Sequence, residues 1–310
     1  MVNQYSELVY SGARLGLPLL FAVWGAMISY RAGVFNVALE GFIMVGAFTH
    51  CVMWEVLKYR ARFTAPGALL GALLITLVVG ALLGAFFGTL VARGLEPITS
   101  GIALNMAVLG IVKALEKAVL DPMLQSYGNG LEFDAVRTAG ITDPVTALAG
   151  VALAGIVILI FVYYRTPSGK RMTAAGRPDG GAEALRQTGR SVPALWIKTS
   201  ISTGVLCAFA GISLVWLTGA YTRDMSAGRG YVALALALIG NRSIVLASIV
   251  ALAYGVAQSP QLLDILDVKF PPQIVTSFPY WLTLLILSAV GLYSRLTRHR
   301  RDLRLGHRVQ

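Results

Sequence analysis

The chain has 310 residues, of which 56% are hydrophobic and 13% are charged, and its mean hydropathy is +0.70. A soluble domain of this size could not stay dispersed with so little charge. Several apolar runs reach the roughly 20 residues that a helix needs to cross a bilayer core. The composition therefore predicts a multi-pass membrane protein. Residues 1–10 are polar and lack a basic stretch, so we expect no cleavable signal peptide.

The net charge of +11 is concentrated in two stretches. Residues 165–198 hold seven Lys or Arg and two acidic residues, and residues 295–310 hold six Arg and one acidic residue. Basic charge beside apolar spans is typical of cytoplasmic loops, whereas a nucleic-acid module needs its charge on a folded soluble face. We therefore expect both stretches, including the C-terminal tail, to be cytoplasmic, and we expect no nucleic-acid partner. Lys58, Arg60 and Arg62 would then lie outside, against the rule.

The apolar runs predict an all-α fold of about eight membrane segments in one transmembrane domain, residues 1–310. Uninterrupted runs cover residues 15–29, 37–57, 65–92, 98–119, 145–164, 192–217 and 280–293. In the stretch 231–258, Gly240-Asn241-Arg242 interrupts a run whose first part is too short to cross a bilayer. We expect a broken or re-entrant helix there, with Asn241 near the break.

Two patterns within these runs predict local contacts. Gly80, Gly84 and Gly88 recur at spacing four, which lets helix backbones approach closely in lipid. Lys113, Glu116 and Lys117 end the run 98–119 and can pair with one another at helical spacing.

The residues offer little for catalysis or for proton coupling. A P-loop and a catalytic triad are both missing. The cysteines, Cys51 and Cys207, lie within apolar runs, so we expect neither a disulfide framework nor a metal or other cofactor. A proton-coupled carrier would bury several acidic or His residues, but only Glu40, beside Asn36, has a clearly apolar setting. This deficit favours energy supplied by a partner and argues against an intramembrane enzyme.

Two interpretations remain open for the polar residues inside the spans. Asn36 could cap the second helix, with Glu40 fixing the break before it, or both could line a substrate pathway. A capping box would place its Glu at residue 39, which is Leu. Asn105, in the middle of the fourth run, could bond between helices or face the pathway.

Residues 31–48, RAGVFNVALEGFIMVGAF, are similar to the signature RxGvxNxgxEGxMlxGAf of ABC importer permeases of the nucleoside and simple-sugar group, kin to ribose and branched-chain amino-acid permeases. The stretches 100–105 (SGIALN), 228–235 (GRGYVALA) and 239–241 (IGN) also resemble that family. The resemblance runs through nearly the whole chain. The length of the chain is similar to that of the shorter of the two permeases in nucleoside-type systems.

The resemblance implies a heterodimer with a second permease, an ATPase subunit with two nucleotide-binding domains, and a binding protein or lipoprotein. It places the chain in a bacterial inner membrane, with ATP used by the partner. Residues 176–189 resemble the cytoplasmic coupling segment GxNPxAAxxxGI, and we expect residues 165–190 to be cytoplasmic and to form a short helix that contacts the ATPase. The positions of that pattern correspond here to Arg177, Pro178, Ala182, Ala184 and Gly189. The segment departs from the pattern by an apparent insertion, by the lack of Asn before Pro178, and by Arg190 where Ile is usual.

The expected function is import of a nucleoside or related small polar solute through a pathway that includes Asn36, Glu40, Asn105 and Asn241. The alternative is a secondary carrier or channel that works without an ATPase.

Overall fold

The computed structural model describes residues 2–120, 139–141, 143–177, 180–240 and 243–259. Within these ranges every regular element is a helix. The helices in chain order are α1 (Val2–Arg31), α2 (Leu39–Glu55) with its π-helical continuation η1 (Val56–Arg60), α3 (Ala65–Ala92), α4 (Pro97–Leu115) with the π-helical η2 (Glu116–Leu120), α7 (Pro144–Arg165), α8 (Pro167–Ala175), α9 (Gly181–Gln187), α10 (Val192–Thr218), α11 (Arg229–Ile239) and α12 (Ile244–Ala257).

Six of these helical segments are long and apolar enough to cross a membrane: Ser6–Arg31, Leu39–Arg60, Ala65–Ala92, Pro97–Val119, Pro144–Arg165 and Val192–Thr218. They match the first six predicted runs, although α1 begins well before residue 15. The all-α prediction is confirmed for the described residues. The predicted last run, residues 280–293, lies outside them, so the eighth segment stays a prediction.

The predicted interruption of residues 231–258 separates two helices, α11 and α12. Gly240 ends α11, and Ser243 begins α12 by accepting a hydrogen bond from the Leu246 amide at 3.4 Å. Asn241 and Arg242 themselves lie outside the described residues. A re-entrant path through the membrane remains a prediction.

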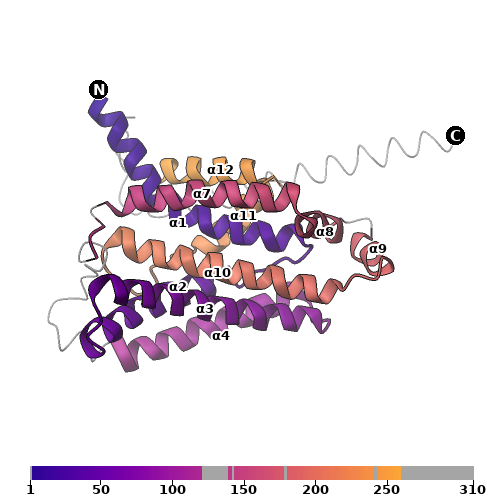
Figure 1. Cartoon of the computed structure of the whole chain (residues 1–310), viewed down its shortest axis with the longest axis horizontal. Coiled ribbons are helices and arrows are strands. Elements are labelled where there is room, and N and C mark those ends of the chain that lie inside the picture. Colours follow the sequence, from indigo (N-terminus) through magenta and orange to yellow (C-terminus); the bar gives the residue numbers. More distant parts are fainter. Residues whose placement is uncertain (1, 121–138, 142, 178–179, 241–242, 260–310) are drawn as a thin grey trace, which may run out of the picture.

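The long helices form a bundle with α1 and α2 at its centre (Figure 1). In the most apolar windows of these two spans, 78% and 83% of the residues are buried, compared with 17% for α7. The helices α8 and α9 gather at the end of the bundle where α1 finishes (Figure 1). Helix α12 runs antiparallel to α1, because Gly12 lies against Val256 while the Trp24 indole donates to the Ser248 hydroxyl at 2.8 Å.

The break after α1 is a Schellman motif. Gly33 has φ +84°, its N–H bonds to the Tyr30 carbonyl at 3.1 Å, and the Val34 N–H bonds to the Ser29 carbonyl at 2.9 Å. A residue with a Cβ atom is strained at this φ. The glycine in the sequence RAG therefore ends α1 and turns the chain toward α2.

The glycine ridge of α3 packs against α10, as its spacing predicts. A Cβ atom on Gly84 would lie 2.2 Å from the Ser200 carbonyl oxygen, and one on Gly80 would lie 2.6 Å from that of Gly204. The two backbones therefore touch along this ridge, where a larger side chain has no room.

We expect Gly84→Ala to destabilise the protein by about 1–3 kcal/mol, because the added methyl group meets backbone that cannot yield. Gly110→Ala is the matched control, since a Cβ atom on this glycine of α4 meets no atom within 4 Å. The measurement is thermal unfolding of both variants in detergent. Equal midpoints for the two variants would contradict the close α3–α10 contact.

Candidate functional site

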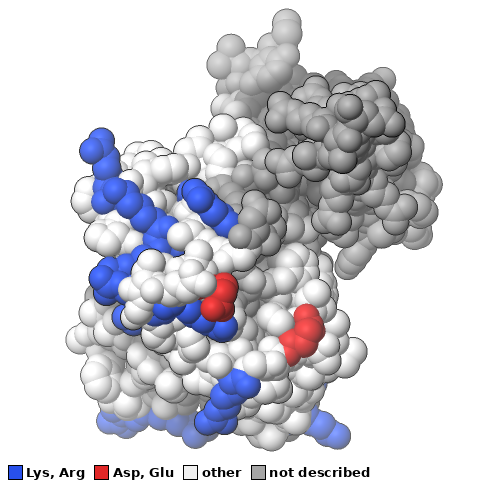
Figure 2. All heavy atoms as spheres, turned by 90° about the vertical axis from the view of Figure 1, so that its right-hand side faces the viewer, with Lys and Arg blue, Asp and Glu red and all other residues white. Residues whose placement is uncertain are grey.

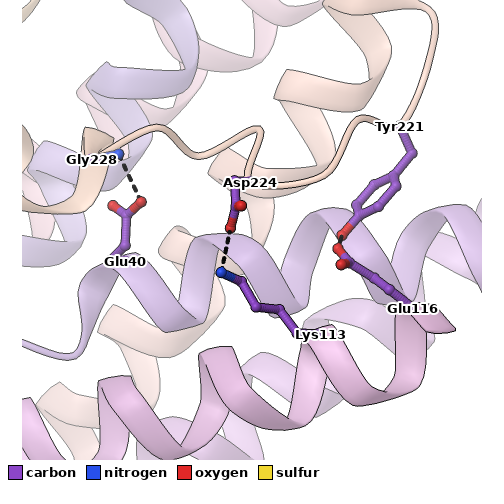
Figure 3. Close-up of polar contacts among 6 residues, drawn as sticks. All are labelled: Glu40, Lys113, Glu116, Tyr221, Asp224 and Gly228. Carbon is purple, nitrogen blue, oxygen red and sulfur yellow. Dashed lines mark hydrogen bonds and ion pairs between the residues drawn. The ribbon is translucent and has the colours of Figure 1, made fainter.

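The carboxylate of Glu40 is buried and receives two backbone hydrogen bonds, of which Figure 3 shows the one from Gly228. Its Oε1 accepts from the Gly228 N–H at 2.8 Å, and its Oε2 accepts from the Gly230 N–H at 2.7 Å. Both N–H groups lie at the start of α11. The N-cap residue, Gly228, has no side chain that could accept a hydrogen bond there. A carboxylate from α2 therefore caps the positive end of α11.

The contact between α2 and α11 requires glycine. A Cβ atom on Gly230 would lie 2.4 Å from the Glu40 backbone nitrogen. Because glycine has no Cβ atom, α11 can begin in direct contact with the first turn of α2.

Asn105 joins the same junction from the middle of α4. Its Oδ1 accepts from the Gly41 N–H at 2.6 Å, and its Nδ2 donates to the Tyr231 hydroxyl at 2.5 Å. The amide therefore bonds between helices, as one of the two interpretations predicts. Because Asn105 is midway along α4, the beginnings of α2 and α11 also lie at mid-depth in the bundle.

Asn36 lies before α2 and does not cap it. The N-cap residue is Ala38, and the Asn36 Oδ1 instead accepts from the Ala38 N–H at 2.9 Å. Asn and Asp form such turns by bonding to the backbone two residues on, which is why the prediction of an Asn36 cap is wrong. The Asn36 Nδ2 is buried and has no hydrogen-bond partner among the residues that the structure describes.

The loop 219–228, which leads into α11, is held against the end of α4 by two contacts (Figure 3). The Tyr221 hydroxyl donates to Glu116 at 2.5 Å, and Lys113 pairs with Asp224 at 3.4 Å. Burial raises the pKa of Tyr221, so the phenol stays protonated and remains a donor. The predicted pairing within the helix is wrong for Lys113 and Glu116, because the folded loop supplies their partners from outside it.

The predicted coupling segment forms two short helices, α8 and α9, where one was expected. A Cβ atom on Gly176, after α8, would lie 2.2 Å from the Arg31 carbonyl oxygen. The Trp196 indole donates to the Ala32 carbonyl at 3.2 Å, and the Arg31 guanidinium lies 4.6 Å from the centroid of the Tyr163 ring. Gly176 of this segment therefore packs directly on the α1–α2 break that leads to Glu40, and Tyr163 of α7 and Trp196 of α10 contact the same break.

The predicted coupling residues occupy different settings. Arg177 and Ala184 are exposed, and Ala182 is half-buried in α9. Gly189, with φ +73°, follows the end of α9 as a helix terminator should. Pro178 lies outside the described residues. Basic side chains spread over this end of the bundle (Figure 2). The cytoplasmic location of this end and the role of the tail 295–310 stay predictions.

The structure thus brings Glu40 and Asn105 to one junction, places Asn36 a few residues away, and does not describe Asn241. Sequence reasoning missed the other half of the junction. Gly228, Gly230 and Tyr231 belong to the stretch GRGYVALA, which carried part of the family resemblance but was not assigned a role. Two glycines around an Arg at the start of a short apolar run were the available signal.

A protein-family model, that of the permease component of branched-chain amino acid transport systems, matches residues 8–290 of this chain. The chain belongs to this permease family. The match covers all six candidate spans almost entirely and includes the Glu40 junction. It makes the protein a multi-pass membrane permease.

Two curated relatives cover most of this chain. The guanosine ABC transporter permease protein NupQ of Bacillus subtilis is 26% identical over an alignment of 288 positions, which covers 87% of this chain and 88% of that protein. The nucleoside ABC transporter permease protein NupC of Lactococcus lactis is 26% identical over an alignment of 310 positions, which covers 93% of this chain and 93% of that protein.

The glucose ABC transporter permease protein TsgB13 of Haloferax volcanii is 24% identical over an alignment of 258 positions, which covers 77% of this permease and 65% of that protein. No solved structure matches the permease significantly.

We expect Tyr221→Phe to destabilise the permease by about 1–3 kcal/mol, because it leaves the buried Glu116 carboxylate without this donor. Lys113→Ala, which removes the neighbouring exposed ion pair, should cost less than about 1 kcal/mol. Thermal unfolding in detergent compares the two variants. A larger loss for Lys113→Ala would show that the exposed pair holds the loop.

A cysteine at Ala184 should resist a membrane-impermeant thiol reagent added to intact cells, because the basic end of the bundle is expected to be cytoplasmic. The control is Phe63→Cys, at the opposite end, where the side chain is exposed and should label. The native Cys51 and Cys207 are buried, so they add little background. Ready labelling of Ala184→Cys in intact cells would contradict the predicted topology and place this end of the bundle outside.

Proposed function

We propose that this permease is the membrane-embedded subunit of an ABC importer that moves a nucleoside or a related small polar solute into the cytoplasm. The pathway passes the junction of Glu40, Asn105 and Tyr231. The observation that carries the proposal is the capping of α11 by the Glu40 carboxylate at mid-depth in the bundle. In membrane transporters, helices that begin or end inside the bilayer often form the substrate site.

The substrate class rests on two supports. Two relatives are named for guanosine and for nucleosides, and a third is named for glucose. The junction offers a carboxylate, an amide and a phenol, which can exchange hydrogen bonds with the hydroxyl groups and ring nitrogens of a neutral polar solute. These solutes share many hydroxyl groups and carry no net charge, so a site of hydrogen-bonding groups suits them better than a site of opposite charge.

The energy comes from a partner ATPase in this proposal, and the permease itself performs no catalysis and holds no cofactor. The ATPase contacts the segment 165–190, a second permease completes the pathway, and a binding protein or lipoprotein delivers the solute. The packing of Gly176 against Arg31 supports this arrangement, because a displacement of α8 and α9 by the ATPase would be transmitted directly to the α1–α2 break.

A flux assay in liposomes tests the proposed function. The permease complex should accumulate radiolabelled nucleoside only when its ATPase and ATP are present. Unlabelled guanosine should compete more strongly than unlabelled glucose. Equal uptake without the ATPase would favour the alternative of a stand-alone carrier or channel.

We expect Glu40→Gln to lower transport about tenfold, because the amide group replaces one acceptor with a donor and charge-assisted hydrogen bonds are about twice as strong as neutral ones. Abundance in the membrane should fall much less than transport. The measurement is ATP-dependent nucleoside uptake, normalised to the amount of protein.

Glu96→Gln is the matched control. Glu96 also caps a helix, accepting from the Ile98 and Thr99 amides at 3.0 and 2.6 Å, but it is exposed at the start of α4. The Thr99 amide lowers the pKa of Glu96, so this carboxylate is charged at neutral pH. Its substitution should leave transport unchanged. Normal uptake by Glu40→Gln at normal abundance would remove Glu40 from the pathway.

A further inference from the structure

A cavity of about 200 Å³ lies between α8, α9 and the beginning of α10. Three cations line it, each from a different part of the chain: Arg171 in α8, Arg190 in the linker after α9, and Lys198 in α10. None of the described residues that line it is acidic. The side chains of these three cations form no ion pair within the described part of the chain.

Two helices, α8 and α10, also begin at the cavity, so that their positive N-terminal ends lie beside it. Ser168 is in the first turn of α8, and Ser191 is the N-cap residue of α10, whose hydroxyl accepts from the Ala194 amide at 3.3 Å. Helix N-termini attract anions. Three cations and two helix N-termini around one space repel one another, and an anion bound among them offsets this repulsion.

The cavity lies where lipid headgroups would be. It is bounded by the connection from the end of one candidate span, Pro144–Arg165, to the start of the next, Val192–Thr218. Tyr164, near the end of the first of these two spans, is 48% exposed, and such aromatic side chains are enriched at the membrane interface. Leu185 and Leu195 add an apolar part to the lining, suited to the glycerol end of a lipid.

We propose that this cavity binds the phosphate group of an anionic phospholipid. Arg171 and Arg190 supply guanidinium groups, whose planar donors match phosphate oxygens, and Lys198 adds a point charge. Basic pockets between membrane helices on the cytoplasmic side bind such headgroups. Figure 2 shows the end of the bundle on which these basic residues lie.

The test measures the lipid that the purified full-length permease retains. The protein is reconstituted in a mixture of phosphatidylglycerol and phosphatidylcholine, extracted in mild detergent, washed, and analysed by mass spectrometry. The wild type should retain phosphatidylglycerol selectively. The variant R171Q/R190Q/K198Q should lose this enrichment by about tenfold or more, because each basic residue near an anionic headgroup contributes substantially to binding.

The matched control is R165Q/K170Q/R177Q, which removes the same charge from exposed residues at the same end of the bundle, outside the cavity lining. It should keep the enrichment. Equal losses in both triple variants would mean that general surface charge attracts the lipid and would overturn the proposal. If the first triple variant does not fold, R190Q alone changes one exposed linker residue and should still reduce retention relative to wild type.

Two further measurements distinguish a bound phospholipid from other occupants of the cavity. Millimolar inorganic phosphate should not displace the retained phosphatidylglycerol, and displacement would identify a free-anion site instead. The enrichment should also persist in the complete complex with its ATPase. Its disappearance there would identify the cavity as an ATPase contact, and the lipid assignment would fail.

Discussion

The hydrogen bonds from the start of α11 to the Glu40 carboxylate are the interaction on which the centre of this bundle depends. A helix that begins inside the membrane region exposes N–H groups that neither water nor lipid can satisfy there, and each unsatisfied group costs several kcal/mol. Glu40 supplies both acceptors from one side chain, and its charge lies at the positive end of the helix. Because Gly230 has no side chain, the capping group and the helix can meet in direct contact.

The junction connects to the surface in two directions. Toward one end of the bundle, the loop 219–228 runs from the end of α10 to the start of α11 and is held by Tyr221 and Asp224 against α4. Toward the other end, residues 32–38 run from the end of α1 to α2, and the connection after α8 packs against their beginning. A displacement at either end therefore has a short, packed route to Glu40, and contiguous packing of this kind can carry coupling between distant sites.

The packing of α3 on α10 shows how the rest of the bundle is held together. Lipid chains are as apolar as leucine, so burying apolar side chains does little to drive association between membrane helices. Close backbone contact takes its place, through Gly80 and Gly84 on one helix and Gly204 on the other. The peripheral helices α4 and α7 keep large apolar side chains exposed, as a surface in contact with lipid or another membrane subunit would.

The sequence by itself determined the helices, because length and apolarity decide what can lie in a bilayer, and its motifs identified the permease family. It also singled out Glu40 and Asn105, since polar groups are costly in apolar runs. Only the tertiary structure decided their partners. The donors to Glu40 lie about 190 residues away along the chain, and Glu116 could have bonded within its own helix had Tyr221 not reached it. Spacing along one helix predicts neighbours on that helix, whereas a hydrogen bond between distant segments exists only once the bundle has packed.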